Sequence, residues 1–221
     1  MISDHSHPAH FGVGLYSVSD AARLVSVPPG RVRRWLSGHL VKQSIDPAEQ
    51  TVTFAELIEL HFIKMFRSQG VSLQAIRKAA AAASKRFGTD YPFSFRRFDT
   101  DGRTIFATLI RDSSNETILE DLKRGQLVFN QIVKPFFKKL EYQGSVEVAR
   151  FWPMEKSGRV VLDPERKFGR PIDAQSGIST RVIYDAVMAG GGQEPSEVAR
   201  WLGISVAAVN AAVAFEQSLA A

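Results

Sequence analysis

Apolar residues recur at helical spacing through the first ninety positions, with turn signals between the runs. Capping boxes begin two of these runs, because Ser17 is followed three residues later by Asp20, and Thr53 by Glu56. Pro29 suits the first turn of a helix, where its missing N–H costs nothing. The pattern therefore predicts four helices, over residues 18–25, 29–37, 54–69 and 73–87.

The predicted helix 29–37 has two unlike faces, because at 100° per residue its apolar and cationic side chains separate. The apolar positions are Val32, Trp35 and Leu36. The cationic positions are Arg31, Arg33 and Arg34. Two short helices joined by a tight turn, the second of them basic, are what a DNA-reading helix-turn-helix requires. An ordinary helical hairpin with a solvated charged face is the alternative that the residues alone leave open.

Residues 38–53 are polar and lie between two predicted helices. Asp46 followed by Pro47 is a turn signal. We expect a short hairpin wing here, which would grip the DNA backbone beside the basic helix. Lys42 is the only Lys or Arg of this segment and a further expected DNA contact.

Residues 89–158 mix strand and helix patterns. Strand-like runs at 92–98 and 104–110 flank Asp101-Gly102, a dipeptide typical of hairpin turns, so two antiparallel strands are expected. Aromatic and apolar residues then recur at helical spacing up to an alternating strand at 146–152. No chemistry-bearing group stands out, and we interpret the segment as a spacer or a dimerisation module.

Residues 159–221 predict a short strand, a Gly/Pro-rich stretch and three helices. The last two helices again have helix-turn-helix spacing, but the exposed positions of the final helix carry no cation to meet a phosphate. Small apolar side chains exposed there suit association with a protein. The tail is therefore predicted to bind protein.

Charge separates the two ends of the chain. The formal net charge is +5 overall, distributed as +4 in residues 1–90, +2 in 91–158 and −1 in 159–221. A basic front and a slightly acidic tail indicate different partners, a polyanion for the front and something other than nucleic acid for the tail.

Composition narrows the possible functions further. The chain has 221 residues, of which 44% are hydrophobic and none is cysteine, so thiolate nucleophiles, cysteine-ligated zinc and disulfides are excluded. We find no catalytic motif, and expect no catalytic residue, metal site or cofactor. Residues 1–13 read as a disordered leader and not as a secretory signal, and no apolar stretch reaches the roughly 18 residues of a membrane span. A soluble, cytoplasmic protein is expected.

Residues 14–88 resemble the MerR-type winged helix-turn-helix. The resemblance rests on four stretches: 16–24 (YSVSDAARL), 33–35 (RRW), 53–57 (TFAEL) and 70–77 (GVSLQAIR). It implies operator DNA as a partner, with expected contacts from Ser17, Arg31, Arg33, Arg34 and Lys42. The long dimerising helix and the cysteine-based metal loop of many MerR regulators are missing, so metal sensing is not implied.

The tail resembles a short helical domain of bacterial antitoxins that are commonly encoded beside a PIN-type ribonuclease toxin. The matching stretches are 159–164 (RVVLDP), 169–172 (GRPI) and 177–180 (GIST), with the three helices after them. The whole order of parts is similar to larger VapB-type antitoxins, which implies a PIN-type toxin partner and a homodimer. Position and charge make Arg166, Lys167 and Arg170 the candidate toxin contacts.

The expected fold is α+β and mostly helical, in four parts: the leader 1–13, a winged helix-turn-helix at 14–88, a mixed segment with a β-hairpin at 89–158, and a three-helix domain at 159–221. The expected function is an antitoxin that neutralises a PIN-type ribonuclease toxin and autoregulates its operon. A stand-alone transcription regulator with a sensing tail is the alternative, and an enzyme is the third hypothesis.

Overall fold

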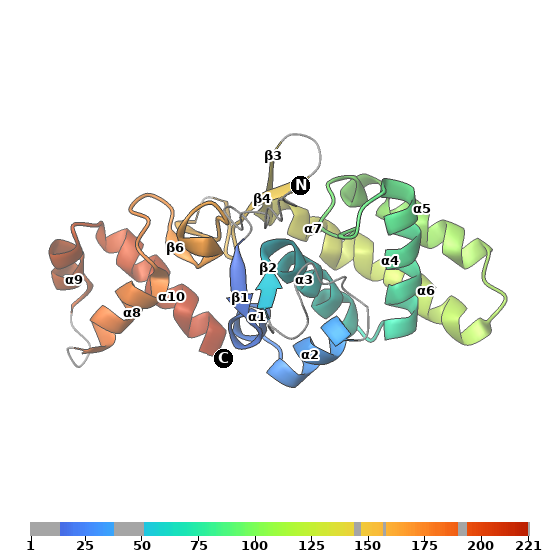
Figure 1. The fold of residues 1–221 in the computed structure, drawn as a ribbon, viewed down its shortest axis with the longest axis horizontal. Helices are drawn as coiled ribbons and strands as arrows, with labels where there is room; N and C mark the ends of the chain where they lie inside the picture. The colour runs from blue at the N-terminus through green and yellow to red at the C-terminus, as the bar shows by residue number, and fades with distance from the viewer. Residues whose placement is uncertain (1–13, 38–50, 144–146, 157, 190–193, 221) are drawn as a thin grey trace, which may run out of the picture.

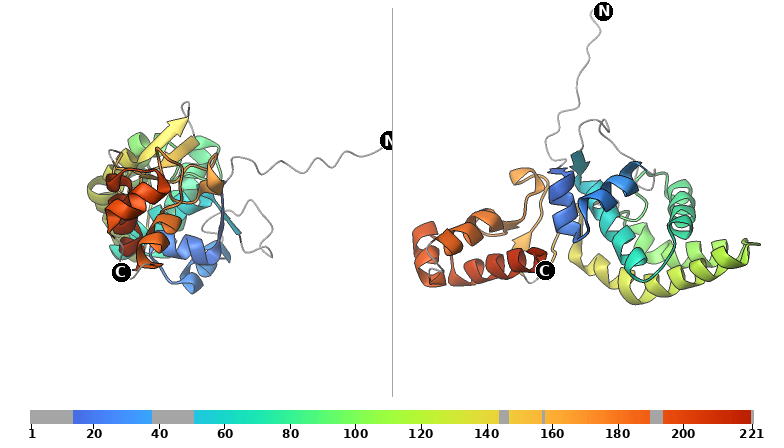
Figure 2. Two further views of the ribbon diagram at one scale, coloured as in Figure 1. Left: turned by 90° about the vertical axis from the view of Figure 1, so that its left-hand side faces the viewer. Right: turned by 90° about the horizontal axis from the view of Figure 1, so that it is seen from below.

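The computed structural model describes residues 14–37, 51–143, 147–156, 158–189 and 194–220. The fold is α+β and mostly helical, with three small two-stranded sheets among the described residues. The first three helices lie in the middle of an elongated molecule, and the fourth lies beside the helices of the middle segment, at the end opposite the C-terminal helices (Figure 1). The right-hand view of Figure 2 shows the C-terminal helices projecting from the rest.

The four predicted N-terminal helices are confirmed, as α1 (Val18–Val25), α2 (Pro29–Ser37), α3 (Phe54–Ser68) and α4 (Leu73–Phe87). Their predicted caps form as well. The Ser17 hydroxyl accepts from the Asp20 backbone N–H at 3.0 Å. At the start of α3 the Thr53 hydroxyl accepts from the Glu56 N–H, and the Glu56 carboxylate accepts from the Thr53 N–H at 2.7 Å. Local hydrogen bonding therefore sets where these helices begin.

Strand β1 (Leu15–Ser17) pairs antiparallel with β2 (Thr51–Thr53), so that each strand leads directly into a helix, β1 into α1 and β2 into α3. The predicted wing joins α2 to β2. Most of it, residues 38–50 with Lys42, lies outside the described residues.

The hairpin predicted at 92–110 is wrong. Residues 97–111 form one continuous helix, α5 (Arg97–Arg111), and Gly102 lies inside it. An added Cβ at Gly102 would lie 2.4 Å from the Phe129 ring, so the glycine permits close helix packing and does not mark a turn. An Asp-Gly pair is a hairpin signal only where the flanking residues form strands, and here helical packing prevails.

The rest of the middle segment is helical up to residue 139 and then forms a hairpin. The helical elements are α6 (Glu116–Val128), a π-helical turn η2 (Phe129–Val133), α7 (Lys134–Phe136) and a 3₁₀ turn η3 (Phe137–Lys139). Strand β3 (Leu140–Gln143) then pairs antiparallel with β4 (Glu147–Phe151). The predicted strand at 146–152 is thus confirmed, with a different partner from the one expected.

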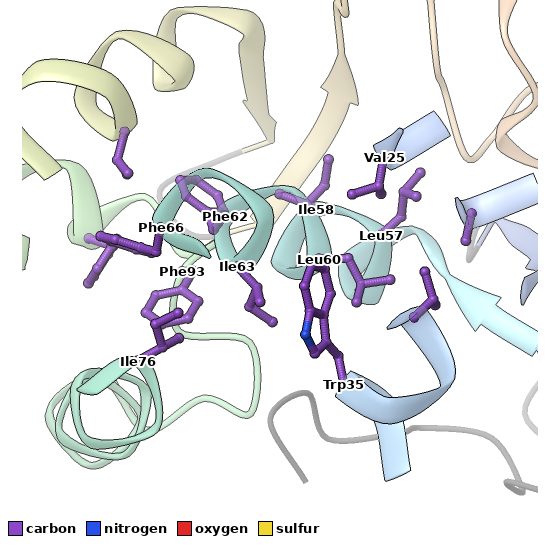
Figure 3. Close-up of a cluster of buried hydrophobic side chains, with 14 of the residues drawn as sticks. Val25, Trp35, Leu57, Ile58, Leu60, Phe62, Ile63, Phe66, Ile76 and Phe93 are labelled. Carbon is purple, nitrogen blue, oxygen red and sulfur yellow. The ribbon is translucent and has the colours of Figure 1, made fainter. Parts of the chain in front are cut away.

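Aromatic side chains form a continuous core that joins the first and middle segments. The fully buried phenylalanines are Phe62, Phe66, Phe93, Phe98, Phe106 and Phe129. Figure 3 shows Phe93, and Ile76 of α4, close to Phe66 of α3, with Phe62 on the same helix as Phe66. The Phe62 and Phe93 ring centroids lie 6.2 Å apart, and those of Phe98 and Phe129 5.2 Å apart. One hydrophobic cluster therefore runs across residue 88, from the helix-turn-helix into the middle segment.

The three predicted C-terminal helices are confirmed, as α8 (Thr180–Ala189), α9 (Pro195–Leu202) and α10 (Val206–Ala220). A small sheet of β5 (Val160–Val161) and β6 (Ile172–Asp173) precedes them, with the short turn η4 (Lys167–Gly169) between its strands. These helices bury a second, smaller core of their own. No single helix of the described chain is long and apolar enough to cross a membrane, although α9 and α10, bent by 112°, pass the length and composition criteria as a pair.

Glu59 is a buried acid in the main core and makes stability depend on pH. Burial raises its pKa to about 8, even though the Ser94 N–H donates to its carboxylate at 2.7 Å. Because this pKa exceeds the value of about 4.3 in the unfolded chain, the stabilising contribution is complete below about pH 4.3 and is lost as the pH rises toward 8.

We therefore expect Glu59→Gln, which cannot ionise, to gain stability relative to the native protein as the pH rises from 5 to 9. The measurement is the Tm of both proteins at several pH values. Glu120→Gln, at an exposed position of α6, is the control and should show no such trend. A Tm difference that stays constant with pH would argue against a protonated Glu59.

Candidate nucleic-acid interface

The first two helices meet at a tight turn. Ser26 ends α1 in the left-handed conformation, with φ of 55°, and its N–H donates to the last carbonyls of that helix. The Val27 N–H donates to the Ala22 carbonyl at 3.0 Å, and the Arg31 N–H to the Pro28 carbonyl at 2.8 Å. These bonds fix the direction in which α2 leaves α1, so that α2 is held as one rigid unit with the turn.

Helix α2 presents the two faces that its sequence predicts. Val32, Trp35 and Leu36 are buried. Figure 3 shows the Trp35 indole pointing from α2 toward Leu60 of α3. Arg31, Arg33 and Arg34 are exposed, and no acidic residue occurs in this helix. The result is a short basic surface of three guanidinium groups on a helix anchored from behind, which can donate to phosphates or to guanine edges in a major groove.

Ser17 is the last residue of β1 and caps the start of α1. Its hydroxyl accepts from the Asp20 N–H and donates to the Asp20 carboxylate at 2.8 Å. The structure therefore groups the three arginines of α2 and places Ser17 beside an exposed carboxylate that repels phosphate. Its contact with DNA stays a prediction.

Two long-range contacts attach the C-terminal domain to α1 and its strand. The Arg23 guanidinium of α1 forms a 2.8 Å ion pair with Glu216 of α10, and the Thr180 hydroxyl donates to the same buried carboxylate. The Tyr16 hydroxyl donates to the Gly169 carbonyl at 2.7 Å. This docking leaves no local signal in the sequence, because the paired residues lie 153 and 193 positions apart.

Glu216→Ala should lower the free energy of unfolding by about 2 kcal/mol, because charged hydrogen bonds to Arg23 and Thr180 are lost while the half-exposed Arg23 can be rehydrated. Urea unfolding at neutral pH measures the change. Glu197→Ala, at an exposed position of α9, is the matched control and should be close to neutral. Equal effects of the two variants would contradict the docking role.

The candidate toxin contacts differ in availability. Arg166 is half-buried and donates to the Ala174 carbonyl at 2.9 Å, so it holds its own loop in place. Lys167 and Arg170 are exposed. Phe168 between them is 64% exposed, although a phenylalanine in a soluble protein is usually buried.

The backbone of this loop is strained. Lys167, Phe168 and Gly169 all have positive φ, of 50°, 56° and 79°, a conformation that costs about 1–3 kcal/mol at each non-glycine residue. Strain of this kind persists where the surroundings enforce it, here through the Tyr16 hydrogen bond to Gly169. Gly169 signals a turn in the sequence, but nothing in the sequence shows that the Phe168 ring stands outward.

Among the described residues, no group of three or more His, Asp or Glu side chains is placed to hold a metal ion. His61, on the apolar stripe of α3, is enclosed by aromatic rings, with Phe151 at 5.0 Å between ring centroids. The buried Nε2 atom of His61 has no hydrogen-bond partner among the residues that the structure describes.

Comparisons with known proteins agree with the geometry of α1 and α2. Residues 16–83 match the family described as MerR HTH family regulatory protein. This part of the chain is a MerR-type helix-turn-helix domain, the class of DNA-binding domain that positions a basic second helix against the duplex.

Most of the chain matches proteins of Mycobacterium tuberculosis. It is 24% identical over 216 residues to a protein of strain H37Rv named "Putative antitoxin VapB45", an alignment that covers 86% of this chain and 89% of that protein. The crystal structure of Rv2018 from the same species superimposes with a TM-score of 0.77 at 23% identity, covering 92% of this chain and 99% of that one. Nearly the whole fold, and not only its helix-turn-helix, therefore has a solved counterpart.

Proposed function

We propose that this protein is the antitoxin of a type II toxin-antitoxin pair, which binds a PIN-type ribonuclease toxin and represses its own operon by binding operator DNA. The observation that carries the proposal is the similarity to the protein named as an antitoxin. That similarity covers 86% of this chain, so it extends well beyond the helix-turn-helix at residues 16–83. An antitoxin acts by binding, which agrees with a chain in which no catalytic motif occurs.

The DNA-binding half of the proposal rests on α2. Its three exposed arginines supply positive charge where a MerR-type domain faces the duplex, and the buried Trp35 keeps the helix in position. We propose binding as a homodimer, because two copies reading two half-sites give the affinity that one short helix lacks.

The toxin-binding half rests on the tail. Lys167 and Arg170 flank the exposed Phe168, so a cationic and aromatic surface is held outward by a rigid loop. Aromatic anchors with neighbouring cations are common in the centres of protein interfaces. Cations placed among the carboxylates of a metal-dependent ribonuclease would compete with its metal ions.

The test is affinity purification of the full-length tagged protein, expressed together with its flanking genes, followed by mass spectrometry of what co-elutes. A PIN-type ribonuclease in stoichiometric amount is the expected result. Phe168→Ala and Lys167→Glu should each reduce its recovery, whereas Lys78→Glu, at an exposed position of α4, should not. Self-association without any protein partner would instead favour a stand-alone regulator.

A further inference from the structure

A cavity of about 350 Å³ lies where the helix-turn-helix, the middle segment and the C-terminal helix meet. Its walls come from the end of α1, from α3, from α7 and β4, and from the last turns of α10. The volume falls within the range of about 300–1,000 Å³ that is typical of small-molecule sites in proteins.

Apolar and aromatic residues make up somewhat more than half of the lining residues, and polar residues make up the rest. Phe136 and Phe151 line it with ring centroids 5.3 Å apart, and Met65 of α3 and Phe215 of α10 lie on it as well. Phe215 is buried in the main core, so this part of the wall is fixed by packing. Such a surface fits an apolar or aromatic body.

His61 places a polar atom in this wall: its buried Nε2 makes no hydrogen bond to any part of the chain that the structure describes. The His61 ring packs against Phe136 and Phe151, at 5.7 and 5.0 Å between ring centroids. Burial and the charges of Lys64 and Lys139 lower its pKa to about 3, so the ring is neutral at physiological pH. A buried polar group without a partner costs stability, and a bound polar group could satisfy it.

Among the described residues, the charged side chains that line the cavity are both cations, Lys64 and Lys139. The Lys139 ammonium donates to the Pro153 carbonyl at 2.8 Å, which orients it and leaves its other N–H groups available. Within the described part of the chain, no Asp or Glu forms an ion pair with Lys64. The wall therefore combines an apolar surface with positive charge that is not neutralised locally.

We propose that this cavity binds an amphipathic organic anion. Its apolar body packs against Met65, Phe151 and Phe215, and its acidic head group lies near Lys64 and Lys139. Ser26 in the turn between α1 and α2 and Leu219 of α10 also line the cavity, so the ligand touches both the helix-turn-helix and the C-terminal helix. Charge complementarity selects an anion over a neutral molecule of the same shape.

The test uses two fluorescent probes of similar shape and size, 8-anilinonaphthalene-1-sulfonate and uncharged N-phenyl-1-naphthylamine, titrated with the full-length protein. The sulfonate should bind one saturable site and bind it more tightly than the neutral probe does. Lys64→Glu should weaken sulfonate binding roughly tenfold or more, because it replaces a positive charge beside the sulfonate group with a negative charge that repels it. Lys138→Glu, at an exposed position outside the cavity wall, is the matched control and should leave the affinity unchanged.

Three results would overturn the proposal: no saturable binding of the sulfonate, equal weakening by both substitutions, or equal affinity for the two probes. Lys64 is half-exposed, so both variants are expected to fold, and an unchanged Tm verifies this. If Lys64→Glu lowers the Tm, Lys64→Gln replaces it, with a smaller but still selective loss of sulfonate affinity. Neither the probes nor the variants involve a toxin, so the outcome is independent of the antitoxin proposal.

Discussion

A variant in which Arg31, Arg33 and Arg34 are all replaced by Ala should bind the DNA upstream of its own gene at least about 100-fold more weakly than the native protein. Loss of a base contact or a phosphate contact costs about 1–3 kcal/mol for each arginine that makes one. All three side chains are exposed on α2, while the buried residues that anchor the helix are untouched. The fold, and so the Tm, should be retained.

Electrophoretic mobility shift or fluorescence anisotropy at several salt concentrations measures this effect. Each lost phosphate contact also reduces the slope of log affinity against log salt by about one. In the matched control variant, Arg103, Lys134 and Lys138 are likewise replaced by Ala. These are three exposed cations of the middle segment, so the control loses the same net charge as the α2 variant. If the control variant loses as much affinity as the α2 variant, binding depends on overall charge and the assignment to α2 is wrong.

Gly102→Val should lower the free energy of unfolding by about 3 kcal/mol, even though valine forms helices more readily than glycine does. Gly102 lies inside α5, and a Cβ there would lie 2.4 Å from one carbon of the Phe129 ring and 2.6 Å from the next. Phe129 is buried and packs edge-on against Phe98, so its ring has little freedom to move aside. The added side chain must push α5 away from the core.

Chemical denaturation of the variant measures the loss. Gly30→Ala is a control that should raise the free energy of unfolding instead of lowering it. Gly30 lies in α2, and no atom lies within 4 Å of a Cβ added there. That substitution should stabilise the protein by about 0.4–1 kcal/mol by restricting the unfolded chain. A neutral Gly102→Val would mean that α5 does not pass as close to Phe129 as the structure shows.

The sequence predicted those elements whose signals are local. Ser17 and Thr53 each cap the helix that follows, and the division of α2 into exposed arginines and a buried face containing Trp35 follows directly from helical geometry. The same local reasoning predicted that Arg31, Arg33 and Arg34 are exposed, and they are exposed in the structure. Their contact with DNA stays a prediction.

The sequence could not predict features that depend on distant partners. Gly102 marks a turn in one context and a close helix contact in another, and only the position of Phe129 decides between them. The pairing of Arg23 with Glu216 and the outward position of Phe168 likewise depend on how remote segments dock. The position of the π-helical turn at Phe129–Val133 could not be predicted either. Gly125 and Pro135 lie on either side of it in the sequence, but neither residue shows where the turn begins.

The aromatic core also determines how the chain can be divided. In many regulators a DNA-binding domain is a portable module, but here Phe62 and Phe66 of α3 pack on Phe93, Phe106 and Phe137, beyond the last residue of α4. A fragment ending at residue 88 would expose this surface to water and tend to aggregate. Recombination that exchanges only the helix-turn-helix between homologues would therefore have to preserve the aromatic contacts of the middle segment, so the two parts are expected to evolve as one inherited unit.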